Sequence, residues 1–425
     1  MSTTRIRVGA LAVVATAVCF VASLAPGQSG RATSTGEHWV TTWATAQQLM
    51  TTPAGGRSGA PPSNLPAAFA NHTVRMIVRT SLGGSRVRIE LSNMLNAQPV
   101  EIGSAHLAIH KGRGTIVEGT DRPLKFGGSS ALTIPPGALA VSDPVNMEVA
   151  PLSDLAVSIY LPRDTGPPTN HPLGLHTAYI SNGDVTASVA MPDPKTMTAY
   201  AWLSSVDVVA PADAFAVVAL GDSITDGYST TLDADQAWPT LLATRLNADK
   251  TQRVAVVNQG ISGNQVLRDG AGLSALARFD RDVLSRPGVK WVILLEGIND
   301  INIRGRVDGP NALTSDELIW GYRQIIARAH AHGIKVIGAT IMPEEGVPTA
   351  SERGEEIRET VNRWIRANGN FDAVVDFDMT IRDPQRPVRL KQQFDPGDHI
   401  HPNDTGNQAM SLLVAVLLRS QTADL

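Results

Sequence analysis

Residues 215–223 read Phe-Ala-Val-Val-Ala-Leu-Gly-Asp-Ser, six apolar residues followed at once by a glycine, an aspartate and a serine. An uninterrupted apolar run of this length is typical of a β-strand that is buried on both faces, as the strands of parallel sheets are. Ligands of open α/β sheets bind at the carboxyl ends of the strands. This segment therefore predicts a parallel sheet with Ser223 at its functional edge.

The alternation of strands and helices continues from this segment to the end of the chain. Further strands are expected at residues 254–257, 291–295, 336–341 and 373–377. Helices are expected near residues 238–246, 276–284, 318–331, 355–367 and 405–418. Strands that alternate with helices indicate a parallel sheet covered by helices on both faces. We therefore predict a three-layer α/β/α domain over residues 213–425.

The preceding part of the chain, residues 38–210, has a different pattern. Residues 74–79 and 86–91 alternate between apolar and polar side chains, and a Gly/Ser-rich turn separates them. This pattern predicts a β-hairpin with one face toward solvent. Short strands, many Gly and Pro residues and no convincing helix favour an all-β domain of the sandwich or jelly-roll-like type.

Length and composition agree with two globular domains. The chain has 425 residues, of which 43% are hydrophobic and 18% are charged, and its formal net charge is −4. That is ample apolar material for a core, and the length exceeds that of one ordinary domain. No basic stripe or cluster is evident, so we expect no nucleic-acid partner.

The first 30 residues are predicted to be a signal peptide and leader. Arg5 and Arg7 precede an uncharged, Ala/Val-rich stretch over residues 8–25, which is the pattern of a secretory signal. A membrane anchor is the alternative, but the stretch is slightly short and rich in small polar residues. We therefore expect a secreted, extracellular protein with no stable membrane insertion. Cys19, the only cysteine, would leave with the leader, which excludes disulfides and thiolate catalysis from the mature chain.

Three residues have the chemistry of a nucleophilic triad. A serine hydroxyl such as that of Ser223 needs an adjacent base to become a nucleophile. The segment Asp398-His399-Ile400-His401 offers one. A spacing of three residues can place Asp398 and His401 on one side of a turn, whereas the side chains of neighbouring residues diverge. We therefore prefer His401 over His399 as the base, with Asp398 as its orienting carboxylate.

Two further residues are candidate donors to an oxyanion. Gly260 ends the second predicted strand, where a backbone N–H can approach a substrate oxygen closely. Asn299 follows the third predicted strand, and its carboxamide can donate to the same oxygen. A helix cap or a plain turn would explain either residue alone. All three strands, however, end in a candidate at the same edge of the sheet.

These motifs, in this order, resemble those of the SGNH hydrolases, which are GDSL-type esterases and lipases. The resemblance is carried by Gly221-Asp222-Ser223, Gly260, Gly297-Ile298-Asn299-Asp300 and Asp398 through His401, and the pair Gly263-Asn264 also looks like the family's second block. It implies a flavodoxin-like α/β/α fold over roughly residues 213–425. It also implies Ser223 as nucleophile, His401 as base, Asp398 as its partner, and an oxyanion hole formed by the Ser223 N–H, the Gly260 N–H and the Asn299 side chain. The β-rich part resembles the N-terminal domain of some two-domain members from secreting bacteria.

The predicted function is hydrolysis of carboxylic esters through an acyl-enzyme, with no metal or organic cofactor. Carbohydrate O-acyl esters, acetyl esters above all, or other short-chain esters are the expected substrates, and a lipase or lysophospholipase is the close alternative. An acyltransferase or a peptidase would use the same triad. A glycan-binding protein on an inactive scaffold should lack a catalytic residue, and none is lost. A flavin or nucleotide site is disfavoured because the segment after residue 220 lacks the phosphate-binding glycine spacings. The sequence does not predict the oligomeric state.

Overall fold

Strand β18 (Phe215–Gly221) lies inside a five-stranded parallel sheet in the computed structural model of the chain, and all of its residues are buried. The strands run in the order β19-β18-β20-β21-β22, and every neighbouring pair is parallel. This order is that of flavodoxin-like doubly wound sheets. The other strands are β19 (Val254–Gly260), β20 (Val289–Leu295), β21 (Lys335–Ala339) and β22 (Ala373–Val375).

The structure describes residues 1–2, 36–49, 64–248 and 253–422. Residues 3–30 of the predicted signal peptide lie outside the described residues, so the expected leader stays a prediction. No helix within the described ranges is long and apolar enough to cross a membrane.

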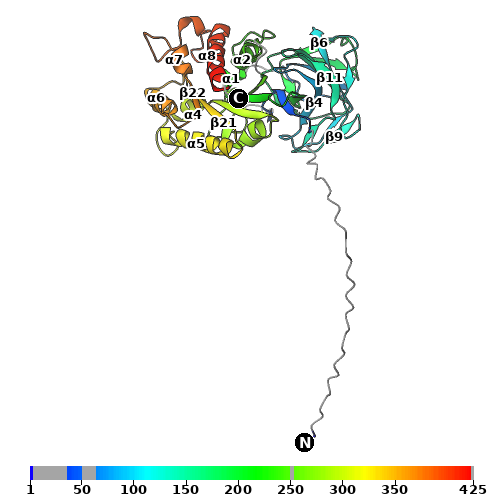
Figure 1. Cartoon of the computed structure of the whole chain (residues 1–425), viewed down its shortest axis with the longest axis horizontal. Helices are drawn as coiled ribbons and strands as arrows, with labels where there is room; N and C mark the ends of the chain where they lie inside the picture. The colour runs from blue at the N-terminus through cyan, green and yellow to red at the C-terminus, as the bar shows by residue number, and fades with distance from the viewer. Residues whose placement is uncertain (3–35, 50–63, 249–252, 423–425) are drawn as a thin grey trace, which may run out of the picture. The chain divides into compact units, whose positions relative to one another are not determined.

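Helices cover both faces of the parallel sheet. Helices α2 and α8 contact each other, and α5 contacts α3 and α6. Figure 1 shows α2 and α8 on one side of the strands and α5 on the other. The three-layer prediction is therefore confirmed. The helices are α1 (Ser223–Asp226), α2 (Trp238–Asn247), α3 (Ala275–Phe279) with the following π-helical turn η1 (Asp280–Leu284), α4 (Ile298–Arg304), α5 (Ser315–Ala331), α6 (Glu352–Arg366), α7 (Phe377–Ile381), the 3-10 turn η2 (Gln392–Phe394) and α8 (Asp404–Thr422).

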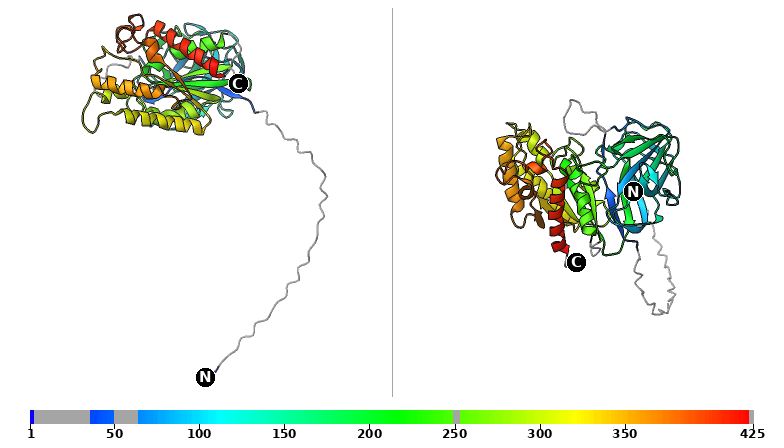
Figure 2. Two further views of the ribbon diagram at one scale, coloured as in Figure 1. Left: turned by 60° about the vertical axis from the view of Figure 1, so that its left-hand side comes forward. Right: turned by 90° about the horizontal axis from the view of Figure 1, so that it is seen from above.

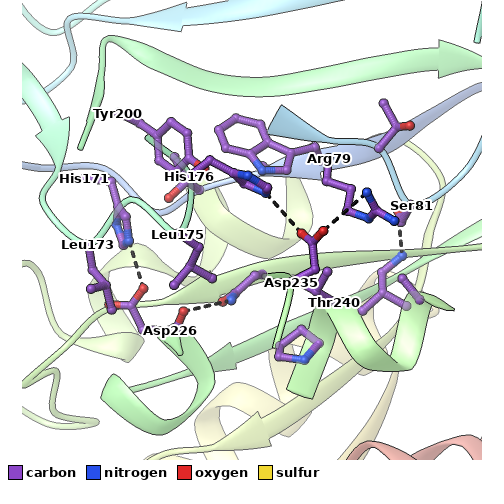
Figure 3. A pocket seen from close by; sticks show the side chains of 18 of the residues that line it. Arg79, Ser81, His171, Leu173, Leu175, His176, Tyr200, Asp226, Asp235 and Thr240 are labelled. Atoms are coloured by element: carbon purple, nitrogen blue, oxygen red, sulfur yellow. Dashed lines mark hydrogen bonds and ion pairs between the residues drawn. The ribbon is translucent and has the colours of Figure 1, made fainter. Parts of the chain in front are cut away.

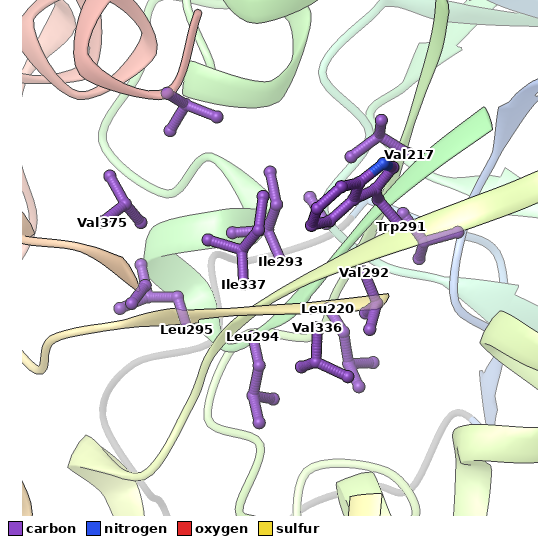
Figure 4. Packing of buried hydrophobic residues seen from close by; sticks show 14 of the residues in the cluster. Val217, Leu220, Trp291, Val292, Ile293, Leu294, Leu295, Val336, Ile337 and Val375 are labelled. Atoms are coloured by element: carbon purple, nitrogen blue, oxygen red, sulfur yellow. The ribbon is translucent and has the colours of Figure 1, made fainter. Parts of the chain in front are cut away.

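Apolar side chains on both faces of the sheet form its core. Leu220, Val292 and Ile337 come from three adjacent strands and are fully buried (Figure 4). Trp291 lies in the same cluster and adds the largest apolar side chain of β20. Burial on both faces is why these strands read as continuous apolar runs, and it holds the strand ends rigidly in line.

The β-rich part, called the β region (residues 37–210), contains two antiparallel sheets. One has the order β1-β17-β4-β10 with β11 also on β4, and the other has the order β15-β14-β3-β12-β6-β7 with β8 also on β6. Small sheets join β16-β13-β2 and β5-β9. The strands are β1 (Trp39–Ala44), β2 (Gln48–Leu49), β3 (His72–Arg79), β4 (Gly84–Ser92), β5 (Val100–Ile102), β6 (Ser104–Gly112), β7 (Thr115–Ile116), β8 (Arg122–Pro123), β9 (Leu132–Ile134), β10 (Leu139–Val141), β11 (Val145–Val149), β12 (Asp154–Leu161), β13 (Thr169–His171), β14 (Ala178–Asn182), β15 (Lys195–Met197), β16 (Tyr200–Ala201) and β17 (Leu203–Val209).

The predicted hairpin between β3 and β4 is wrong. Strand β3 pairs with β12 and β14, whereas β4 pairs with β17, β10 and β11, so the two strands belong to different sheets. Their apolar side chains, such as Val74 and Ile89, meet in the core between the sheets. The supposed solvent face of β3 also carries Arg75, which is fully buried and donates to the Ser158 hydroxyl and three backbone carbonyls.

The β region and the α/β region pack directly on each other (Figure 2). Strand β1 contacts β19, the Thr41 N–H donates to the Pro287 carbonyl, and the Val256 N–H donates to the Ser81 hydroxyl. Residues from Glu37 onward form one compact unit. The proposed division into two domains near residues 211–213 therefore stays a prediction, while the packing itself places the β region beside the parallel sheet.

Candidate active site

Ser223 is the first residue of α1, immediately after β18. Asp222 caps this short helix, because its carboxylate accepts the Ile224 N–H at 3.0 Å. The turn is tight, since a Cβ on Gly221 would lie 2.2 Å from the Thr225 hydroxyl and 2.4 Å from the Leu295 carbonyl. Burial, reinforced by the nearby charges of Asp300 and Asp226, raises the pKa of Asp222 to about 7. The turn presents the Ser223 hydroxyl at the carboxyl edge of the sheet.

Ser223, His401 and Asp398 form a continuous chain of hydrogen bonds. The Ser223 Oγ lies 2.8 Å from His401 Nε2, and His401 Nδ1 lies 2.8 Å from Asp398 Oδ2. Asp398 Oδ1 accepts the backbone N–H groups of Ile400 and His401. Partial burial disfavours the charged carboxylate, but the hydrogen bonds from His401 and Ile400 hold the pKa of Asp398 down at about 2. The carboxylate is therefore ionised throughout the neutral range.

His399 does not take part in this chain of hydrogen bonds. Its Nδ1 lies 2.6 Å from Asp395 Oδ2, and its side chain is nearly half exposed. The structure thus brings Asp398 to His401, as the three-residue spacing predicts, and pairs His399 with a different carboxylate.

Tyr228 is a neighbour of the triad that the motif analysis missed. Its ring centroid lies 4.3 Å from that of His401, so the ring packs against the imidazole. The next residue, Ser229, donates weakly to Asp398 Oδ2 at 3.4 Å. Both residues follow α1 directly, and the left-handed Gly227 turns the chain toward His401. In the sequence, Tyr228 and Ser229 are marked only by their closeness to Ser223, and this does not predict their contacts with His401 and Asp398.

The two predicted oxyanion donors, Gly260 and Asn299, differ in whether all of their donating N–H groups already have a hydrogen-bond acceptor. The Gly260 N–H donates to Asn258 Oδ1 at 2.9 Å, within the last residues of β19. It is therefore already used, and in this conformation it does not offer a free donor for an oxyanion. Asn299, in the first turn of α4, donates one amide hydrogen to the Asn264 carbonyl at 2.9 Å. A carboxamide has two such hydrogens, so Asn299 keeps one for a ligand.

The loop after β19 offers another donor, Gly263. Its φ is +81°, and its N–H finds no acceptor in the ranges of the chain that the structure describes. The loop lies across the end of β18, because the Ile261 N–H donates to the Gly221 carbonyl. The pair Gly263-Asn264 was visible in the sequence, but the strand-end rule favoured the earlier glycine. Ser223 itself, as the first residue of α1, has an N–H with no carbonyl partner inside the helix.

Arg278 fixes the strand ends beneath these donors. It is fully buried and donates to the carbonyls of Gly221 and Gln259 and to the Asn264 side chain. Its charge is balanced by Asp282 at 3.1 Å and faces Glu296 at 3.5 Å. One guanidinium thereby ties β18, β19 and the loop that carries Gly263 into a single rigid unit.

Asp300, next to Asn299, holds the far end of the same loop. Its carboxylate accepts the N–H groups of Val266 and Leu267 at 2.8 and 3.1 Å. Burial raises the pKa of Asp300 to about 6, although these two N–H groups act in the opposite direction. Two neighbouring residues of α4, Asn299 and Asp300, thus both bind the segment that contains Gly263.

Comparison with known proteins identifies the α/β region. Residues 219–409 match the model of the GDSL-like Lipase/Acylhydrolase family. No curated protein sequence matches the chain. Similar solved structures include a G-D-S-L family lipolytic protein from Desulfitobacterium hafniense (23% identity, 48% of this chain and 98% of that one, TM-score 0.36). Others are an aryl esterase from M. smegmatis (20%, 49% and 99%, TM-score 0.39) and a carbohydrate acetylesterase from Sinorhizobium meliloti (17%, 49% and 99%, TM-score 0.36).

The matched segment runs from within β18 to within α8 and contains every residue of the hydrogen-bonded chain from Ser223 to Asp398. The resemblance inferred from the short motifs is therefore confirmed at the level of the family. Residues 219–409 therefore form a GDSL-like lipase/acylhydrolase domain, of the SGNH hydrolase type, and this domain makes the chain a carboxylic ester hydrolase.

Proposed function

We propose that the chain is a secreted serine esterase that uses Ser223 as nucleophile, His401 as general base and Asp398 as the orienting carboxylate. The observation that carries the proposal is the continuous chain of 2.8 Å contacts from the Ser223 hydroxyl through His401 to Asp398. A serine is activated when a base at hydrogen-bond distance can take its proton. The base in turn needs a partner that fixes its tautomer, and Asp398 has that position.

The reaction proceeds through an acyl-enzyme. Ser223 Oγ attacks the ester carbonyl carbon while His401 Nε2 removes its proton, and a tetrahedral oxyanion forms. His401 then returns the proton to the leaving alcohol as the C–O bond breaks. Water repeats the sequence on the acyl-enzyme and releases the acid.

The oxyanion hole is proposed to consist of the Ser223 N–H, the Gly263 N–H and the Asn299 side chain. Gly263 replaces Gly260 in this assignment, because Asn258 occupies the Gly260 N–H. Donors that are already oriented before the reaction stabilise the developing charge without reorganisation. The hydrogen bonds of Arg278 and Asp300 to the surrounding loop provide that orientation.

Replacement of Asn299 by alanine is expected to lower kcat for p-nitrophenyl acetate about 100- to 1,000-fold, with little change in KM, because one oxyanion donor acts mainly in the transition state. Steady-state kinetics measure both constants. Asn302→Ala is the matched control on the same helix, since Asn302 contacts Glu344 and Thr349 instead of the Gly263 loop. Equal losses in the two variants would point to damage to α4 and would contradict the role of Asn299.

The proposed substrates are carbohydrate O-acyl esters, acetyl esters in particular. The predicted leader and the added β region support this choice, because they suit an exported enzyme that meets a polymeric substrate. The test uses protein without residues 1–30 on p-nitrophenyl esters from acetate to palmitate and on an O-acetylated polysaccharide. We expect highest kcat/KM at the shortest acyl chains and release of acetate from the polymer. An optimum at palmitate without acetate release would favour the lipase alternative.

A further inference from the structure

His171 brings a buried positive charge from the β region to the α/β region. It ends β13, and only 3% of its side chain is exposed. Its Nδ1 lies 2.8 Å from the Ala46 carbonyl and its Nε2 lies 2.9 Å from Asp226 Oδ1. A neutral imidazole has a single N–H and cannot donate to both acceptors. The imidazolium form, which carries an N–H on both ring nitrogens, donates to both acceptors at once.

The surroundings of His171 agree with a charged ring. Burial alone would lower its pKa, but the charge of Asp226, the hydrogen bond to it and the Ala46 carbonyl together raise the pKa above the usual value. The other oxygen of Asp226, Oδ2, accepts two hydrogen bonds from Ser262. A buried ion pair thus joins β13 to α1.

The second oxygen of Asp226 holds the loop with the proposed oxyanion donor. Asp226 Oδ2 accepts the Ser262 N–H at 2.8 Å and the Ser262 hydroxyl at 2.7 Å. Ser262 immediately precedes Gly263. Asp226 is also the last residue of α1, three positions after Ser223. One carboxylate therefore connects the nucleophile's helix, the Gly263 loop and the β region.

The β region also contacts the segment that follows α1, residues 229–235. Asp235 pairs with His176 at 3.1 Å and with Arg79 at 3.3 Å. Figure 3 shows these contacts and the His171–Asp226 pair around one cavity of about 60 Å³. The same segment reaches the start of α8, three residues after His401, since Thr231 donates to Asp404 through both its N–H and its hydroxyl. The two sets of contacts involve different residues of the β region and line the same cavity.

We propose that His171 is a positioning residue of the active site: its ion pair with Asp226 holds Ser262, and thereby the Gly263 N–H, where the oxyanion forms. The inference rests on the proposed function of Ser223 and Gly263. The β region is then a structural part of the catalytic centre, and the ion pair has a role beyond joining the two regions. A displacement of about 1 Å in a reacting or stabilising group can cost about 100-fold in rate.

The test compares full-length wild-type protein with its His171→Ala, His171→Gln and Ser262→Ala variants on p-nitrophenyl acetate. We expect His171→Ala to lower kcat about 10- to 100-fold with KM nearly unchanged, as for a misplaced oxyanion donor. His171→Gln keeps a donor for Asp226 and should recover part of kcat. Because His171 and Ser262 act through the same carboxylate, the losses in the His171→Ala/Ser262→Ala double variant should not add.

His106→Ala is the matched control. His106 forms a similar pair with Asp121 at 2.8 Å, on β6 of the β region, and lines no part of the cavity in Figure 3. It should leave kcat unchanged. A folded His171→Ala variant with wild-type kcat would overturn the inference. If that variant does not fold, wild-type kcat in both His171→Gln and Ser262→Ala overturns the inference, and a lower kcat at constant KM in Ser262→Ala supports it.

A measurement on the ring itself separates this inference from the proposed function. Nitrogen NMR of the wild-type protein at pH 7, above the usual histidine pKa of about 6.5, should show both ring nitrogens of His171 protonated. A neutral ring would remove the ion pair and overturn the inference. Comparison of wild-type protein with Ser223→Ala reports on the proposed function independently of the state of His171.

Discussion

Replacing Ser223 with alanine is expected to remove ester hydrolysis almost completely, with a loss in kcat of about 10⁴- to 10⁶-fold, because no other group can form the acyl-enzyme. The structure gives the reason: Ser223 Oγ is the atom at 2.8 Å from His401 Nε2, at the end of β18. The measurement is the hydrolysis of p-nitrophenyl acetate under saturating substrate, with a covalent serine-directed phosphonate as a second readout. The variant should neither turn over nor become labelled.

Two comparisons make this result specific. The Ser223→Ala protein should unfold at the wild-type temperature or above, because the change removes only one hydroxyl from the first turn of a short helix. His399→Ala should keep wild-type kcat, since His399 contacts Asp395 and not Ser223. Full activity in Ser223→Ala would refute the assigned nucleophile, and loss of activity in His399→Ala would refute the assigned base.

The sequence predicts the structure best where local backbone geometry or an uninterrupted apolar run determines it. The continuous apolar run from Phe215 to Leu220 predicts a strand buried on both faces, and the structure has that strand inside the parallel sheet. The short spacing from Asp398 to His401 also left few possible geometries. The contact between Asp398 and His401 at 2.8 Å depends on the local backbone, so the four-residue segment 398–401 is enough to predict it.

The sequence is less informative where specific side-chain contacts, most of them between distant residues, decide the outcome. Alternation along β3 predicted a solvent face, yet Arg75 lies buried there because carbonyls from residues 114, 186 and 188 satisfy its guanidinium. The sequence around position 75 does not indicate these hydrogen-bond partners. The strand pattern predicts Gly260 as an oxyanion donor, and it does not show that the side chain of Asn258 accepts the Gly260 N–H in this structure. The pair of His171 and Asp226, 55 positions apart, is likewise visible only in three dimensions.

The second large effect is expected for Asp398→Asn, with a loss in kcat of about 10⁴-fold at neutral pH, comparable to that of an Asp-to-Asn change in other serine triads. Asparagine can keep the Oδ1 acceptor that binds the Ile400 and His401 N–H groups, so the loop should stay in place. Its amide would, however, face His401 Nδ1 with a donor. The imidazole would then carry its proton on Nε2, pointing at Ser223, and could not accept the serine proton.

Because the pKa of Asp398 is lowered to about 2, the carboxylate stays ionised above roughly pH 3, so its titration cannot shape the activity profile near neutrality. The stability that this lowered pKa contributes is present above the ordinary aspartate pKa of about 4 and is lost as the pH falls through 2. Asp395→Asn is the matched control, since Asp395 binds His399 and the Gly397 N–H in the same loop. If Asp395→Asn lost as much activity as Asp398→Asn, the loop's structure rather than the tautomer of His401 would be the cause, and the assignment of Asp398 would fail.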